Sequence, residues 1–208
     1  MKKITVFFIF LFVVKFSVAQ LSVGAAFGTF NVPAASQRFK GYAPTVRIEY
    51  TGGEETQQVY LDVSLYKKDQ AGFGTDIYDD DGNSIGYAAT VKAYSIKHIQ
   101  LGFKRSLAGN FTDTKFNCFL GGGGVVSFVQ TNYKYNLPGY VIPDEKVNRT
   151  LYGFHFNTGG QWRIKKIVLE LRGNFDLVLK PITTDGGDNT SNILTSLRLG
   201  VMVPIVKY

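Results

Sequence analysis

The sequence predicts an all-β protein, an antiparallel up-and-down transmembrane β-barrel of about eight strands that follows a cleaved signal peptide. Three observations predict this fold. Segments with alternating apolar and polar residues recur along the chain, which is typical of strands with two different faces. The connections between these segments are alternately short and long. The composition, with 23 Gly, 17 Phe and 12 Tyr among 208 residues, is rich in residues that strands and their turns favour.

The first residues have the pattern of a signal peptide. Lys2 and Lys3 precede an apolar run over residues 4–14, and Ser17-Val18-Ala19 provides the small residues of a cleavage site. The run is too short to cross a bilayer as a helix, although a retained N-terminal anchor helix is the alternative. We therefore expect two regions, a signal peptide over 1–19 and an outer-membrane β-barrel domain over 20–208.

The last two strands are the clearest. Over residues 167–179 the odd positions are apolar apart from one glycine, while the even positions include Glu170, Arg172 and Asp176. Over residues 193–205 the odd positions are again almost all apolar, and Arg198 lies on the other face. Each segment has the length of a membrane-spanning strand, about 9–11 residues.

The other strands follow the same alternation less strictly. The segment 91–104 is weak in its first half, and the segment 115–129 is apolar on both faces and rich in glycine. The six further strands are predicted at 21–30, 43–50, 59–66, 91–104, 115–129 and 151–162.

The lengths of the connections support a barrel in a membrane. Short connections are expected at 51–55, 106–114 and 163–166, and long polar loops at 67–90, 130–150 and 180–192. Membrane barrels have short periplasmic turns and longer extracellular loops, so the long loops are expected at one end.

The polar faces of these strands predict the contents of the lumen. In hydrocarbon the sheet must close to satisfy its backbone groups, and eight strands leave a lumen that side chains fill. Buried charges need partners, so we expect the three cations and four anions on the polar faces, together with both histidines, to form an interior network. A solvated outer face of a soluble barrel is the alternative. The predicted network comprises Arg47, Glu49, Asp62, His98, His155, Glu170, Arg172, Asp176 and Arg198.

Several motifs invite a chemical role, and each has a simpler interpretation. His98 and His155 lack the further ligands that a metal site needs. The glycines 121–124 precede no Gly-Lys-Ser/Thr and lie within a strand, so they indicate close packing across the lumen and not a phosphate loop. The acidic segment 76–83 does not fit an EF-hand and is expected to be a solvated loop tip, with a weak divalent-cation site as the alternative. Cys118 is expected to be a small buried apolar residue. We predict no catalytic residue, cofactor or metal.

Aromatic residues are expected near the strand ends, where membrane barrels carry interfacial girdles. The outer set comprises Phe30, Tyr42, Tyr66, Tyr87, Phe128, Tyr133 and Tyr152, and the inner set Tyr50, Phe103, Phe116, Trp162 and Tyr208.

The charge does not indicate a nucleic-acid partner. The formal net charge is +7, and removal of Lys2, Lys3 and Lys15 with the signal peptide leaves 7 − 3 = +4. The basic residues are scattered, with no run longer than two, whereas a nucleic-acid binder concentrates them in a patch.

Taken together, these features resemble the small eight-stranded outer-membrane barrels of Gram-negative bacteria, the OmpX/OmpA-type, porin-like families. The terminal strand 197–208 is similar to the signal that the barrel-assembly machinery reads, although Tyr208 stands where Phe is usual and Pro204 interrupts the strand. Because proline lacks a donor, regular pairing is expected to end near Val203. The resemblance implies an outer-membrane location, a monomer, and contacts with outer-membrane lipid or lipopolysaccharide and, during biogenesis, with the barrel-assembly machinery.

The leading interpretation is a non-enzymatic outer-membrane protein whose long loops make surface contacts, bind an unknown ligand or support the envelope. Two alternatives remain. One is a lipid-modifying outer-membrane enzyme, although the deacylases in this group have Ser two residues after their His, where this chain has Asn157 after His155. The other is a soluble periplasmic β-barrel that belongs to a secretion or assembly complex.

Overall fold

The computed structural model describes residues 20–32, 39–52, 54–139, 141–180 and 192–207, and these residues form one closed barrel of eight antiparallel strands. The predicted signal peptide, residues 1–19, lies outside the described residues. The strands are β1 (Gln20–Val32), β2 (Phe39–Thr51), β3 (Gln57–Tyr78), β4 (Ser84–Ala108), β5 (Phe116–Asn136), β6 (Glu145–Ile164), β7 (Ile167–Val178) and β8 (Ile193–Lys207).

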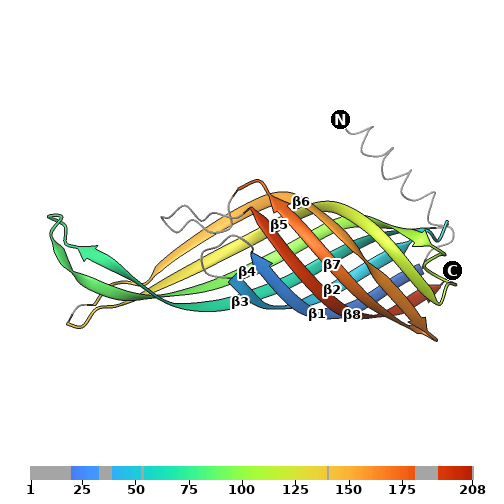
Figure 1. Ribbon diagram of the computed structural model, residues 1–208, viewed down its shortest axis with the longest axis horizontal. Helices are drawn as coiled ribbons and strands as arrows, with labels where there is room; N and C mark the ends of the chain where they lie inside the picture. The colour runs from blue at the N-terminus through green and yellow to red at the C-terminus, as the bar shows by residue number, and fades with distance from the viewer. Residues whose placement is uncertain (1–19, 33–38, 53, 140, 181–191, 208) are drawn as a thin grey trace.

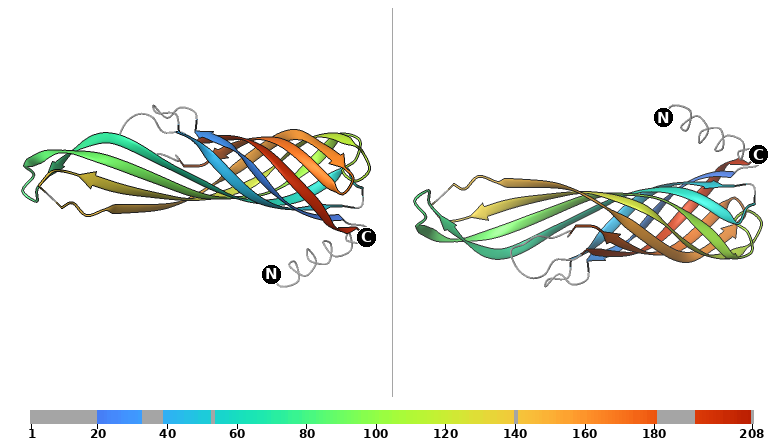
Figure 2. Two further views of the ribbon diagram at one scale, coloured as in Figure 1. Left: turned by 90° about the horizontal axis from the view of Figure 1, so that it is seen from below. Right: turned by 90° about the horizontal axis from the view of Figure 1, so that it is seen from above.

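Each strand pairs with the next one along the chain, and β8 pairs with β1 to close the barrel (Figures 1 and 2). The short connections 52–56, 109–115 and 165–166 lie at one end, where β1 begins and β8 ends. We call this the inner end and the opposite one the outer end. The prediction of an up-and-down barrel of eight strands is confirmed.

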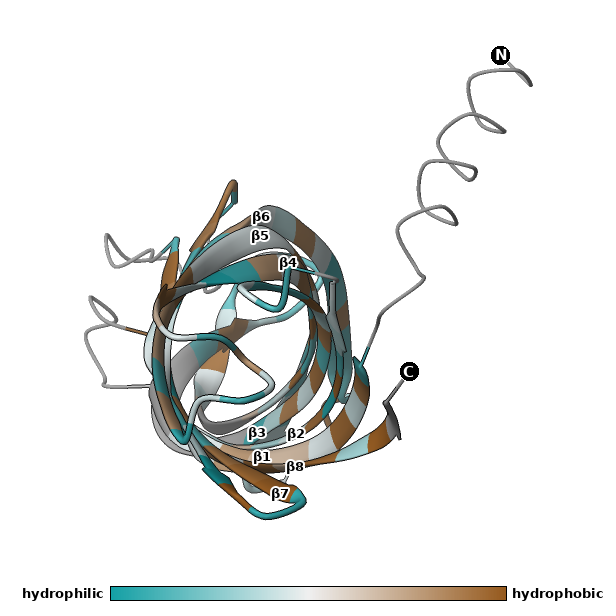
Figure 3. Ribbon diagram, turned by 90° about the vertical axis from the view of Figure 1, so that its right-hand side faces the viewer, coloured by the Kyte–Doolittle hydropathy of each residue, from teal (hydrophilic) through white to brown (hydrophobic). Residues whose placement is uncertain are grey.

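The two faces of the wall differ as the alternation predicts. In β7 the residues alternate between exposed and buried, and the exposed ones include Ile167, Leu171 and Phe175. Seen from the inner end, the hydropathy bands alternate along the strands (Figure 3). Apolar side chains cover the outside of every strand, so the exterior is suited to hydrocarbon and not to a soluble barrel. The described residues contain no helix that is long and apolar enough to cross a membrane.

Four neighbouring strands extend far beyond the rest at the outer end. β3 to β6 have 20 to 25 residues, whereas the other four have 12 to 15. They form a sheet that projects to the left of the barrel in Figure 1. The predictions of long loops at 67–90 and 130–150 are therefore wrong in part. Most of these residues continue the ladder, because β-strands tolerate polar side chains on solvated faces, and the connections shorten to 79–83 and 137–144.

Pro204 does not end the pairing of β8. The register shifts between Leu21 and Ser22, so that Ser22 pairs with Pro204 and Leu21 pairs with Val206. A bulge accommodates the missing proline donor, which is why the strand continues to Lys207, beyond the predicted end near Val203.

The aromatic residues divide between the two faces. At the outer end Tyr42 and Tyr152 are exposed, as a girdle requires, but Phe30 and Tyr66 are 1% and 0% exposed and point into the barrel, which corrects their assignment. Phe128 is also exposed, as are Phe103, Phe116 and Trp162 toward the inner end. Tyr87 lies in the projecting sheet, and Tyr208 is outside the described residues.

Candidate functional site: the barrel interior

The structure places all nine predicted network residues inside the barrel, and none is more than 2% exposed. They come from six strands, β2, β3, β4, β6, β7 and β8, and converge because each occupies an inward position of its strand. Alternation alone brings them together, since a closed barrel directs every second side chain to the same axis.

Arg47 lies at the centre of the inner half of the lumen. Its Nε and Nη2 donate to the two carboxylate oxygens of Asp62, each at 2.6 Å, and its Nη1 donates to Glu170. This two-point pairing suits the planar guanidinium, which matches the geometry of a carboxylate. A charge that would be costly alone is thereby held against two carboxylates from β3 and β7.

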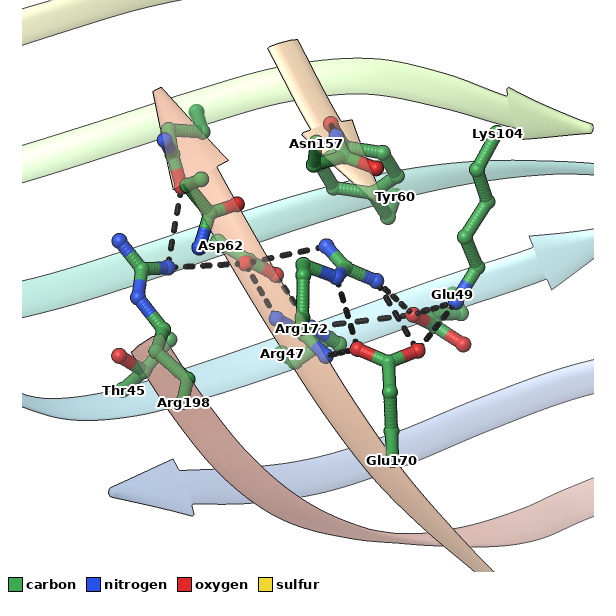
Figure 4. A network of polar contacts seen from close by, with 12 residues as sticks. Thr45, Arg47, Glu49, Tyr60, Asp62, Lys104, Asn157, Glu170, Arg172 and Arg198 are labelled. Atoms are coloured by element: carbon green, nitrogen blue, oxygen red, sulfur yellow. Dashed lines mark hydrogen bonds and ion pairs between the residues drawn. The ribbon is translucent and has the colours of Figure 1, made fainter. Parts of the chain in front are cut away.

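Arg172 and Lys104 complete the cluster (Figure 4). Nη2 of Arg172 lies 2.9 Å from Oε1 of Glu49, and its Nε lies 2.7 Å from Oε1 of Glu170. Lys104 Nζ lies 2.6 Å from an oxygen of Glu49 and 2.6 Å from an oxygen of Glu170. Sequence reasoning missed Lys104. It is the last residue of the predicted strand 91–104, and it was not assigned to the inward face together with His98. With it, the buried side chains that the structure describes include four Lys or Arg residues and four carboxylates, so the two signs balance among them.

A second chain of contacts runs toward the outer end. Arg198 Nη1 donates to Gln100 Oε1 at 3.0 Å, and Gln100 Nε2 donates to Asp176 Oδ1 at 2.6 Å. The other Asp176 oxygen lies 3.1 Å from His98 Nε2, and His98 Nδ1 lies 2.7 Å from the Ser127 hydroxyl. This chain connects the charged cluster to the upper lumen through polar side chains from four strands.

His155 occupies a separate position on the lumen wall. Its Nδ1 lies 3.1 Å from the Gly124 carbonyl, and its Nε2 contacts the Tyr60 hydroxyl, which also accepts from Asn157. A Cβ on Gly102 would lie 2.7 Å from the Tyr60 hydroxyl and 2.9 Å from the imidazole. Glycine is needed there because these large side chains cross the lumen directly above the backbone.

The outer half of the lumen is mainly apolar. Eleven buried residues form one hydrophobic cluster there; they are Phe30, Val32, Ala43, Tyr66, Tyr94, Ile96, Val125, Val129, Leu151, Val178 and Leu194. Tyr66 joins the two halves, since its ring packs against Phe30 and its hydroxyl accepts from Arg198 Nη2 at 2.7 Å.

The connection 109–115 covers the inner mouth. Phe111 is 3% exposed, its backbone nitrogen donates to the Glu55 carbonyl at 2.7 Å, and its own carbonyl accepts from Arg163 at 2.6 Å. The Lys104 ammonium lies 5.4 Å from the centre of the Phe111 ring and 4.7 Å from that of Phe119. Aromatic rings therefore lie on the inner side of the charged cluster, and the apolar cluster lies on its outer side.

Ser127, His98 and Asp176 have the composition of a hydrolytic triad, which the sequence did not reveal because the three residues are far apart along the chain. Their arrangement does not suit hydrolysis. The serine is 3% exposed and the other two are 0% exposed, so a substrate cannot reach the hydroxyl. The set is better explained as part of the interior network.

The remaining sequence motifs have local explanations. Among the described residues no group of three His, Cys, Asp or Glu side chains is placed to hold a metal ion. In the acidic segment, Asp79 accepts from the backbone nitrogens of Asn83 at 2.7 Å and Asp81 at 3.1 Å. The hydrogen bond from the Asn83 backbone holds the pKa of Asp79 below its ordinary value. Cys118 is half-buried and alternates with the inward-facing Asn117 and Phe119, so it is not the fully buried residue that was predicted.

No protein-family model and no curated protein matches the chain. Solved structures do match. A major outer membrane protein from Thermus thermophilus aligns with a TM-score of 0.63 at 14% identity, over 90% of this chain and 99% of that one. Ail, the attachment invasion locus protein of Yersinia pestis, in complex with the heparin analogue sucrose octasulfate, aligns with a TM-score of 0.52 at 8% identity, over 90% and 98%. The chain therefore has the fold of outer-membrane β-barrel proteins.

Proposed function

Because the chain is an outer-membrane β-barrel by fold, we propose that it is a non-enzymatic, non-conducting integral protein of the outer membrane that displays its projecting sheet at the cell surface. One observation carries this proposal: paired charges occupy the inner half of the lumen and an apolar cluster its outer half, while four strands extend beyond it at the outer end. A filled lumen supports neither transport nor catalysis, so the projecting sheet is the part left for function.

The same fold supports contact with other molecules. The Yersinia pestis protein with a TM-score of 0.52 is an attachment protein that was solved with a sulfated sugar. Fold alone does not decide function. The likeness indicates that this architecture can accommodate contact with molecules at the cell surface.

Orientation is the first thing to test. In a Cys118→Ser background, a cysteine at Asn83, in the β3–β4 turn, and one at Lys166, in the β6–β7 turn, mark the two ends. We expect a membrane-impermeant maleimide to label the first variant on intact cells and the second only after the outer membrane is permeabilised. The proposal fails if Lys166→Cys is labelled on intact cells and Asn83→Cys is protected, or if the protein is extracted by carbonate as a soluble periplasmic component.

The enzyme alternative is tested by substitution of the buried Ser-His-Asp set. Ser127→Ala and His98→Gln should leave the lipid A and phospholipid profiles of expressing cells the same as wild type, as should the His155→Gln variant. A lipid change that depends on the wild-type chain and disappears in Ser127→Ala would replace the non-enzymatic proposal with a lipid hydrolase.

A further inference from the structure

The outside of the barrel changes character at one level on three neighbouring strands. Moving outward along β4, the exposed residues change from Phe103 and Leu101 to Lys97. Lys97 pairs in register with Phe128 of β5, which pairs with Thr150 of β6. One step farther out the register aligns Ser95, Gln130 and Asn148. The apolar belt therefore ends on all three strands together, and polar side chains begin.

A hollow of about 290 Å³ lies at this boundary. Lys97 supplies a cation to its lining, and no carboxylate contributes to it. Arg149 borders the hollow from an inward position of its strand, paired with Val129; the other lining residues are Ser95, Phe128, Val129, Gln130, Asn148 and Thr150. The Gln130 amide donates to Asn148 Oδ1 at 3.0 Å, which leaves the Asn148 amide nitrogen as a further donor. Hydroxyl and amide donors around a cation form an environment that favours an oxyanion.

A second exposed cation lies beside the hollow. Lys67 of β3 pairs in register with Ser95 and is exposed, on the same outer face as Lys97. The lysine ammonium acts as a point charge that binds phosphate, and the apolar stem of the side chain can pack along a lipid-facing surface. Lys67 pairs in register with the exposed Tyr42, and Lys97 pairs with the exposed Phe128. Two lysines beside aromatic residues at the edge of an apolar belt suit a ligand that has an anionic headgroup and acyl chains.

We propose that this hollow binds the phosphate of a phosphorylated glycolipid of the outer leaflet, with Lys97 and Lys67 as the principal cations. The inference rests on the proposed membrane location and adds a specific lipid partner to it. A lipid phosphate, and not a free anion, fits the position, because the hollow is continuous with the hydrocarbon-facing belt through Phe128, which is 44% exposed. The acyl chains would then lie against Leu101 and Phe154 below it.

The test measures lipid A binding to the folded, full-length mature protein in detergent. Diphosphorylated lipid A should raise the temperature at which the compact, unboiled gel band is lost, whereas dephosphorylated lipid A and inorganic phosphate should not. We expect the Lys97→Glu/Lys67→Glu variant to bind lipid A at least about tenfold more weakly than wild type. Equal binding of dephosphorylated lipid A, or a response to inorganic phosphate alone, would overturn the assignment to a lipid phosphate.

Lys134→Glu is the matched control. Lys134 is exposed on the same face of β5 and lies four residues beyond Gln130, about 13 Å farther out. The Lys134→Glu variant should bind lipid A with an affinity within about twofold of wild type. A loss of affinity as large as that of the double variant would indicate diffuse electrostatic attraction and not a specific site. If the wild-type protein gives no compact, heat-sensitive gel band, the proposed membrane barrel itself is contradicted. A compact band without lipid A binding contradicts only the lipid site.

Discussion

The two halves of the barrel interior differ in chemistry. In the inner half Arg47, Arg172 and Lys104 are held by Glu49 and Glu170, and most contacts are ion pairs from different strands. In the outer half, eleven apolar residues pack together. The inner half is sensitive to the loss of a partner, because an unpaired charge remains buried, whereas the outer half is sensitive only to lost volume.

The largest effect is expected where a charge loses its partners. Arg47→Met leaves Asp62 and Glu170 without their shared guanidinium and should lower the free energy of unfolding by about 4 kcal/mol. Urea unfolding in detergent, followed by the compact gel band, measures this. The double variant Arg47→Met/Asp62→Asn should lose less than the sum of the single variants, because it removes both members of a pair. Strict additivity would mean that the two groups are solvated separately.

A cavity in the outer half should cost somewhat less. Leu151→Ala removes a 2% exposed side chain from the apolar cluster and should lower the free energy of unfolding by about 3 kcal/mol. The control is Tyr152→Ala, at the next residue along β6. The Tyr152 side chain is 60% exposed on the lipid face, where lipid or detergent can fill the space that it leaves. If both variants lose the same amount, the outer lumen is not closely packed.

Tyr66 joins the two halves, and its hydroxyl can be removed alone. Tyr66→Phe keeps the ring beside Phe30 but leaves Nη2 of Arg198 without this acceptor, so we expect a loss of about 2 kcal/mol. The matched control is Tyr42→Phe, whose ring is 66% exposed and stacks on Phe27 outside the barrel. A negligible loss for Tyr66→Phe would show that the two halves are energetically independent.

The smallest effect concerns the tip of the projecting sheet. The pKa of Asp79 is lowered from its ordinary value of 3.8 by the hydrogen bond from the Asn83 backbone. A depressed pKa stabilises the folded turn above the ordinary value, and that contribution is lost as the pH falls through the folded pKa. The amide signals of Asp81 and Asn83 should therefore titrate together with a midpoint below 3.8. Asp79→Asn should abolish the titration, and a midpoint above 3.8 would contradict the turn geometry.

The same contrast explains what could be predicted from the sequence. Arg172 and Asp176 were found because they alternate with apolar, outward-facing residues. Ile96 and Val129 were not assigned a face for two reasons. Around Ile96 the alternation is inverted, with the polar Ser95 and Lys97 outside and the apolar residue inside, whereas Val129 lies inside next to the apolar, outward-facing Phe128. That is why 91–104 looked weak in its first half and 115–129 looked apolar on both sides. Phe30 and Tyr66 were placed in the girdle because they lie near strand ends, and that criterion does not distinguish an inward from an outward position.

The projecting sheet was missed for a different reason. Residues 67–90 and 130–150 are rich in polar residues and glycine, a composition shared by solvated loops and by solvated strands. Only the pairing partners decide between them, as the ladder from Lys68 and Tyr94 to Tyr78 and Ser84 shows. The Ser127–His98–Asp176 set was likewise invisible, since it depends on which inward positions of β4, β5 and β7 meet across the lumen of the closed barrel.

The central claim is that both halves of the lumen are filled, so that the barrel does not conduct. Planar-bilayer recording of the purified, folded chain tests it most directly, with a heat-shifted gel band as proof that the sample is a closed barrel. We predict no stable conductance steps for the wild-type protein. Large, stable single-channel steps from the same heat-shifted sample would contradict a filled lumen and make transport the function to pursue.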